Sequence, residues 1–172
     1  RAVGPDHQRT VTVQNNVAVM TVQAGDFEGA VEQYRDLLAR QERLQGPAHP
    51  LTTTVRRGLG ITLARLERWE EAEAVLREAL RASEAEGEPG TVAVVTTLGQ
   101  LGSVYEALGR ADEATGAVDR AVALAERYLD GQPAHESALR ARSVVRGRLG
   151  DEEGAAADAD AAAALRAARG GS

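Results

Sequence analysis

The sequence has no cysteine and very few aromatic residues, and each shortage narrows what the chain can be. Without cysteine it has no disulfide framework and no thiolate metal or redox site. Only 3% of the residues are aromatic, whereas 33 of the 172 residues are alanine. A core made from such residues consists of closely packed small side chains, and alanine is the strongest helix former. The composition therefore predicts an all-α protein.

Lysine and long apolar runs are missing as well. All 20 basic residues are arginine, and 26 acidic residues give a net charge of −6. A net acidic domain argues against direct binding of nucleic acid. No apolar run approaches the roughly 20 residues of a membrane span, and the N-terminus has no signal-peptide pattern. We therefore expect a cytoplasmic protein that does not contact membranes.

An internal repeat with a period of 42 residues dominates the sequence. Gly4-Pro5-Asp6-His7 recurs as Gly46-Pro47-Ala48-His49, and the same shift pairs Ala30 with Ala72. A third copy follows in register, and a fourth follows after a small register change. The copies span about residues 4–45, 46–87, 88–131 and 132–169, with tails at 1–3 and 170–172. We interpret residues 4–172 as a single array of four repeats.

Each copy has the pattern of two helices joined by a short turn. In the second copy Pro47 suits a first helical turn, so a helix is expected from Pro47 to about Leu66, and Glu67-Arg68 then makes the turn. A second helix is expected from Trp69 to about Ala85, with Gly87 ending it. The other turns are expected at Gly25-Asp26, Gly109-Arg110 and Gly150-Asp151, where Asp26 and Asp151 can cap the next helix. The pattern predicts about eight antiparallel helices, and the β-prone segment 92–95 falls inside one of them.

Two positions of the repeat hold small residues, as close stacking of helical hairpins requires. The first position is Ala18, Gly60, Gly102 and Ser143, and the second is Ala30, Ala72, Ala114 and Ala155.

The spacing of Gly102, Gly109 and Ala114, with Tyr105 between them, resembles the tetratricopeptide repeat. The 42-residue period and Asn15-Asn16-Val17-Ala18 resemble the kinesin-light-chain-like subclass of that family. The fourth copy resembles a common bacterial variant, in which Arg142 and Asp158 would pair between the two helices. The resemblance implies a right-handed α-solenoid of bacterial origin. HEAT and armadillo arrays have similar periods, but the small-residue positions favour the tetratricopeptide interpretation.

Two departures from the family pattern stand out. Glu67 takes the place of the usual turn glycine, and Ala159 and Ala163 stand where larger residues would fill the stack. The alanine pair predicts a loosely packed last hairpin, or one covered by something else.

No catalytic constellation is evident. The repeat-related histidines His7, His49 and His135 are expected to cap or pack helix ends rather than bind a metal. The many carboxylates are expected in first helical turns, where they suit the helix dipole. No serine has a histidine in a nucleophile pattern. We expect neither a cofactor nor enzymatic activity.

The resemblance implies that the first helix of each repeat lines a concave, peptide-binding face. The predicted binding residues are Thr12, Asn15, Val19, Thr54, Arg57, Ile61, Arg65, Ser103, Glu106, Arg140, Val144 and Arg148, and Gln23, Thr96, Gly99 and Ser137 share that face. Arginine suits carboxylates in forked pairs, so an acidic or extended peptide is the expected ligand. The alternative, that these arginines are solvated or pair with Glu106, stays open. The family's carboxylate clamp is missing, because Asn15, Val19, Gly58, Thr96 and Gln100 occupy its positions.

The leading hypothesis is a non-catalytic scaffold that binds a peptide or partner protein. The second is a sensor or regulatory segment of a larger bacterial signalling or transcription-regulating protein, and the start at Arg1 fits excision from a longer chain. Self-assembly through the end repeats is a third hypothesis.

Overall fold

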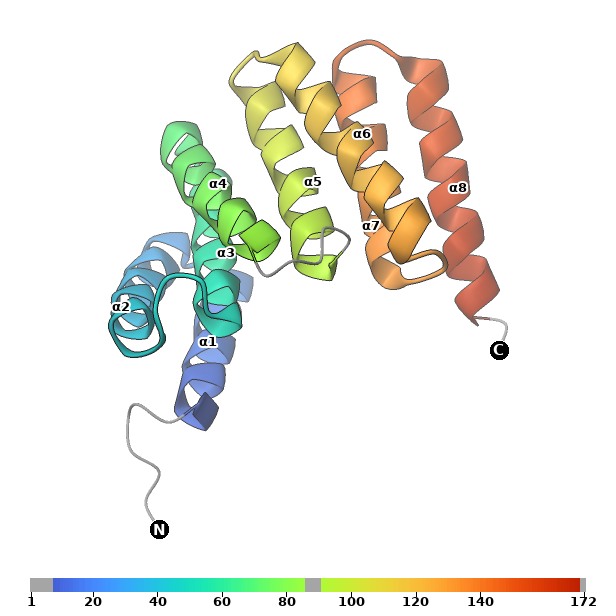
Figure 1. Ribbon diagram of the computed structural model, residues 1–172. Coiled ribbons are helices and arrows are strands. Elements are labelled where there is room, and N and C mark those ends of the chain that lie inside the picture. Colours follow the sequence, from blue (N-terminus) through green and yellow to red (C-terminus); the bar gives the residue numbers. More distant parts are fainter. Residues whose placement is uncertain (1–7, 86–90, 171–172) are drawn as a thin grey trace. The chain divides into compact units, whose positions relative to one another are not determined.

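The computed structural model describes residues 8–85 and 91–170, and these residues form eight α-helices and no strand (Figure 1). The helices are α1 (Gln8–Gln23), α2 (Phe27–Gln45), α3 (Pro50–Arg65), α4 (Trp69–Ala85), α5 (Val92–Ala107), α6 (Ala111–Tyr128), α7 (Pro133–Arg148) and α8 (Glu152–Gly170). The all-α prediction is confirmed. The chain divides into two compact units, Arg1–Glu86 with α1 to α4 and Gly87–Ser172 with α5 to α8. The expectations for His7 and Gly87 lie outside the described residues.

The turns inside the four hairpins lie where the sequence predicts them. Gly25, Gly109 and Gly150 have φ values of +88°, +72° and +90°, which glycine adopts without steric cost. Glu67 takes the same left-handed conformation at φ +58°, so the departure from glycine changes the residue and not the turn. The predicted caps are also present. The Asp26 carboxylate accepts from the Gly29 N–H, and the Asp151 carboxylate accepts from the Gly154 N–H, both at 2.9 Å.

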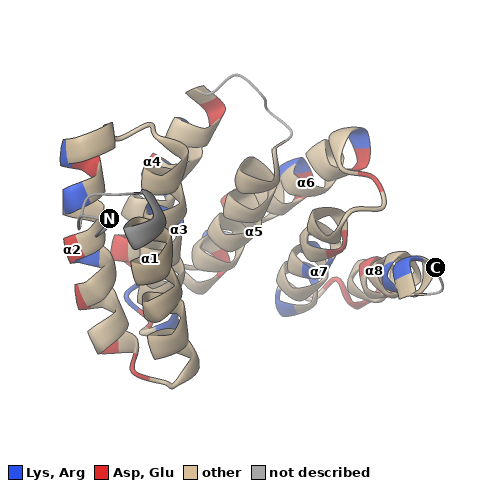
Figure 2. Cartoon of the chain, turned by 90° about the horizontal axis from the view of Figure 1, so that it is seen from below, with Lys and Arg blue, Asp and Glu red and all other residues tan. Residues whose placement is uncertain are grey.

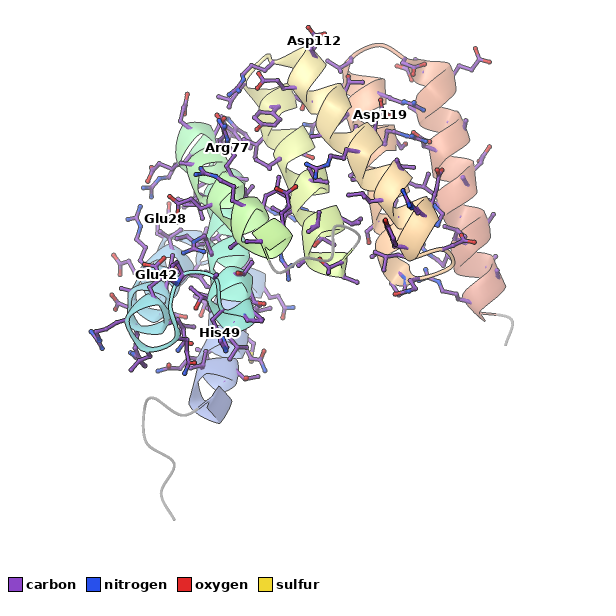
Figure 3. All side chains as sticks on the ribbon, in the orientation of Figure 1. Glu28, Glu42, His49, Arg77, Asp112 and Asp119 are labelled. Atoms are coloured by element: carbon purple, nitrogen blue, oxygen red, sulfur yellow. The ribbon has the colours of Figure 1, made fainter. Side chains whose placement is uncertain are left out.

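The start of α3 differs from the prediction. The helix begins at Pro50 and not at Pro47, which lies in the preceding turn. The reason is a cap: His49 Nδ1 accepts a hydrogen bond from the Leu51 N–H at 3.2 Å, so Pro50 takes the first helical position, where its missing N–H costs nothing. Figure 3 labels His49 at this end of α3. The expected capping role of His49 is thereby confirmed.

Small residues lie where the helices cross. Ala18, Ala30, Ala72 and Ala114 are completely buried. A methyl group on Gly102 would come within 2.4 Å of Val118 Cγ1, and one on Gly60 within 2.6 Å of Leu76 Cγ. In the last hairpin the half-buried Ser143 instead donates its hydroxyl to the Ala155 carbonyl at 2.8 Å. The repeat therefore depends on short distances between helix backbones.

Within each unit the second hairpin packs on the first through its leading helix. In the first unit α3 contacts α1 and α2, and a methyl group on Gly58 would come within 2.7 Å of the Tyr34 ring. In the second unit α7 contacts α5 and α6, and Val145 packs with Ala114 and Val118. A large side chain on one helix thus lies opposite a small one on the next.

Candidate functional site

A hollow of about 360 Å³ opens in the first unit between α1 and α3. Its lining includes five of the predicted binding residues and Gln23. The full lining is Asn15, Val19, Val22, Gln23, Tyr34, Thr54, Arg57, Gly58, Ile61 and Thr62. Asn15, Val19 and Gln23 are four residues apart on α1, and Thr54, Arg57 and Ile61 have helical spacing on α3, so each set shares one face.

The floor of the hollow is apolar. Tyr34 reaches it from α2 and is almost fully buried, and this burial raises the pKa of its phenol. Gly58 makes room for the ring because it carries no side chain. Val19, Val22 and Ile61 complete the apolar surface.

The polar groups of this hollow differ in their surroundings. The Thr54 hydroxyl donates to the Pro50 carbonyl at 2.9 Å, and the Thr62 hydroxyl donates to the Gly58 carbonyl at 2.8 Å. Asn15 and Arg57 are half-buried on facing helices. Arg57 is the one charged residue among the described residues of the lining, and burial lowers the pKa of its guanidinium. A desolvated cation of this kind is stabilised by an anionic group that approaches it.

Thr12 and Arg65 lie outside this hollow, although both are exposed on α1 and α3. The binding face of the first unit is therefore smaller than the sequence predicts, and it is centred on Asn15 and Arg57.

In the second unit the predicted residues are dispersed. Arg148 donates to the Glu106 carboxylate at 2.6 Å, which ties α7 to α5. The alternative that an arginine pairs with Glu106 is confirmed for Arg148.

The Ser103 hydroxyl points back to the Gly99 carbonyl at 3.4 Å. Gly99 itself is buried, and a methyl group there would come within 3.2 Å of Ala141 Cβ, so its expected place on an open face is wrong.

A second hollow, of about 430 Å³, lies between α7 and α8. It is lined by Arg140, Ser143, Val144, Ala159, Ala163 and Arg166. The prediction of loose packing at Ala159 and Ala163 matches this opening. Arg140 and Val144 of the predicted set lie here.

Glu136 organises the arginines around the second hollow. Its carboxylate accepts from Arg166 at 2.6 Å and also from Arg169, and Arg140 Nε lies 3.6 Å away. The hydrogen bond from Arg166, together with the nearby positive charges, lowers the pKa of Glu136. Sequence reasoning missed this cluster because Glu136 and Arg166 are 30 residues apart.

The described residues offer little that suggests metal binding or a membrane crossing. No group of three or more His, Cys, Asp or Glu side chains in residues 8–85 and 91–170 is placed to hold a metal ion. His135 is buried, with Nδ1 3.2 Å from Asp130 Oδ1. Among the described helices, none combines the length and the apolar character that a membrane crossing demands.

Sequence reasoning also missed three lining residues of the first hollow, Val22, Tyr34 and Thr62, and named Gly58 only as a position of the missing carboxylate clamp. The available signal was the pairing of a large residue at position 34 with a glycine at position 58, one hairpin later. Such complementary sizes appear only when neighbouring copies are compared with each other.

Comparisons with known proteins agree on the repeat. The sequence models of the tetratricopeptide repeat match residues 9–85 and 94–136, which together make up more than half of the chain. A comparison with curated proteins finds no match.

Solved structures show the same fold. BtubC (BKLC) from P. vanneervenii superposes with a TM-score of 0.80 at 23% identity, covering 100% of this chain and 68% of that one. A Podosopora anserina protein, described as a kinesin light chain with nearly identical TPR-like repeats, gives 0.73 at 17% identity, covering 98% and 80%. A MamA RS-1 ArsTM double mutant gives 0.62 at 16% identity, covering 95% and 79%.

Proposed function

Because the chain belongs to the tetratricopeptide repeat family, whose repeats mediate protein–protein interaction, we propose that it binds an extended, acidic peptide segment of a partner protein. The first unit provides the binding surface, in the hollow between α1 and α3. The role is that of a non-catalytic scaffold.

One observation carries this proposal. The hollow places a partly desolvated guanidinium, Arg57, opposite the amide of Asn15 over an apolar floor. A carboxylate side chain would offset the desolvation of Arg57 with charge-assisted hydrogen bonds. Asn15 can donate to and accept from a peptide backbone, while Val19 and Ile61 can contact apolar side chains of the same peptide.

The second unit contributes less to this surface. Arg148 is bound to Glu106, and Arg140 lies beside Glu136. Both arginines are more than half exposed but already lie beside a carboxylate, so we expect them to adjust affinity and not to define the ligand.

The test is a titration with two labelled peptides, one of alternating Glu and Leu and one with Gln in place of every Glu. Fluorescence anisotropy should show roughly tenfold tighter binding of the acidic peptide, which corresponds to about 1.4 kcal/mol. Arg57→Gln should remove this preference. Arg65→Gln is the matched control, because it changes an exposed arginine of the same helix outside the hollow. An unchanged preference in Arg57→Gln, or no binding of either peptide, contradicts the proposal.

The alternative function, a regulatory segment within a larger signalling protein, uses the same surface with an intramolecular ligand. The domain content of the full reading frame tests it.

A further inference from the structure

The first helix exposes an apolar stripe on one face. The stripe consists of Val13, Val17 and Met20, which are 60%, 48% and 66% exposed and lie four and three residues apart. Arg9 is the only charged residue within α1, and in Figure 2 most of α1 is tan while charged residues are frequent along α2. We refer to these three apolar residues as the leading face.

The repeat shows what this face does in other hairpins. A shift of 42 residues places the leading face on Val55, Leu59 and Thr62 of α3, which are all buried where α3 packs on the preceding hairpin. In the fourth copy the equivalent residues are Ala138, Arg142 and Val145, and Val145 packs with Val118 of α6. The leading face is therefore half of an interface that the chain already forms between its own hairpins.

The other half of that interface is open on the hairpin of α7 and α8. Val118 and Val122 of α6 are buried in the second unit, where α7 packs against α6. Their equivalents in α8 are Ala159 and Ala163, which line the hollow of about 430 Å³ together with the half-exposed Val144. We refer to Val144, Ala159 and Ala163 as the trailing face.

We propose that the trailing face binds the leading face of a second copy of this chain, so that α1 of one copy docks against α7 and α8 of another. The occupant follows from the repeat: every hairpin that has a successor in the same unit is covered by the first helix of that successor. Here α1 supplies such a helix with its apolar stripe uncovered.

Side-chain sizes fit this pairing. The internal contacts pair larger residues with smaller ones: the Tyr34 ring lies against Gly58, and Ala141 packs on the cluster that contains Val118. At the trailing face the equivalent residue is the small Ala159. Its partner by repeat register is Asn16, which is larger than Gly58 or Ala141 and so replaces part of the volume that Ala159 lacks.

The polar rim is compatible with the same partner. Arg140 and Arg166 border the trailing face, and their side chains are 58% and 57% exposed. The side-chain amide oxygen of the exposed Asn16 on α1 can accept a hydrogen bond from one of these guanidiniums. Because α1 contributes no carboxylate, docking leaves the ion pairs of Glu136 in place.

The contact joins two different faces, so a pair of copies still carries one free leading face and one free trailing face, to which further copies can add. The apparent mass of the full chain should therefore rise with concentration above the monomer mass of 18.1 kDa. Light scattering coupled to size exclusion, or sedimentation equilibrium, measures it.

Two variants make the test specific. Val17→Glu blocks the leading face and Ala163→Glu blocks the trailing face, and each alone should remain monomeric. An equimolar mixture of the two should form a species of twice the monomer mass and stop there, because each variant retains the complementary intact face. Leu44→Glu and Ala161→Glu, at exposed positions outside both faces, should associate like the parent chain.

Circular dichroism shows whether each variant is folded. A parent chain that stays monomeric at millimolar concentration overturns the proposal. So does a folded Val17→Glu or Ala163→Glu variant that associates as the parent does, or a mixture without the dimer. The peptide-binding proposal is independent, since it depends on Asn15 and Arg57 and not on these faces.

Discussion

The guanidinium of Arg142 donates two hydrogen bonds to the carboxylate of Asp158, at 2.9 and 2.7 Å, and so joins α7 to α8. Asp158 is nearly buried and also accepts from Arg146 at 3.0 Å. The hydrogen bonds to Asp158 are the chief reason that the pKa of the Arg142 guanidinium is raised. The pairing that the fourth repeat copy implies is thus present, with a second arginine added.

Removal of Asp158 should destabilise the second unit strongly. Asp158→Ala removes the buried carboxylate that Arg142 and Arg146 share and leaves them the more exposed Asp119, at 3.4 and 3.6 Å. We expect a loss of about 2–4 kcal/mol in the free energy of unfolding. Arg142→Ala should cost less, because Arg146 still contacts Asp158. Urea unfolding followed by circular dichroism measures both. Asp160→Asn is the control, since Asp160 is exposed on the same helix. Equal losses for Asp158→Ala and Asp160→Asn would contradict the assignment.

Replacement of Glu67 by glycine should stabilise the first unit. Glu67 has φ +58°, a conformation that costs a residue with a Cβ atom about 1 kcal/mol more than it costs glycine. We expect Glu67→Gly to raise the free energy of unfolding by about 0.5–1 kcal/mol. The reverse change, Gly109→Glu at φ +72°, should lower it by a similar amount. A thermal melt that shows Glu67→Gly to be less stable than the parent would refute the strain argument.

The crossing of α5 and α6 should not accept an added methyl group. A Cβ atom on Gly102 would lie 2.4 Å from Val118 Cγ1, so Gly102→Ala should cost about 1–3 kcal/mol. Val118→Ala removes the obstructing group, as Ala159 does naturally opposite Ser143. A double-mutant cycle should therefore show that the combined variant is about 1 kcal/mol more stable than the sum of the single effects. Strict additivity would mean that the two side chains do not compete for space.

The stability contributed by Glu136 should depend on pH in a defined direction. Its pKa is lowered in the folded state by the hydrogen bond from Arg166 and by the neighbouring arginines. The contribution is therefore fully present above the unfolded pKa of about 4.3 and disappears as the pH falls through the lower folded value. We expect Glu136→Gln to be less stable than the parent at neutral pH, and the difference to shrink below about pH 4. Urea titrations across this range measure it, with the exposed Glu126→Gln as control. A difference that grows on acidification would reverse the sign and reject the account.

Much of the fold can be predicted from the sequence because the repeat supplies the same signal four times. Gly25, Gly109 and Gly150 mark the turns, and the register then identifies Glu67 as a turn residue despite its unfavourable propensity. The start of α3 could not be predicted in this way. Pro47 and Pro50 both suit a first helical turn, and the choice depends on the cap that His49 provides.

The candidate site was predictable only in part. Helical spacing identifies the face of α1 that holds Asn15 and the face of α3 that holds Arg57, since both depend on neighbours within a helix. Tyr34 arrives from α2, and its position depends on how closely Gly58 lets α3 approach. The Glu136 cluster likewise depends on how the ends of α7 and α8 meet, which the periodicity of one helix does not encode.

The most direct test of the proposed function observes Arg57 and Asn15 while a peptide binds. In nuclear magnetic resonance spectra of the labelled chain, the Arg57 Nε–H and Asn15 side-chain amide signals should shift during titration with the Glu-Leu peptide, and the shifts should saturate together. The Gln-Leu peptide should move the Asn15 signal more than the Arg57 signal. If both signals stay in place while signals from α2, α4, α6 or α8 shift, the peptide binds elsewhere and the account is wrong.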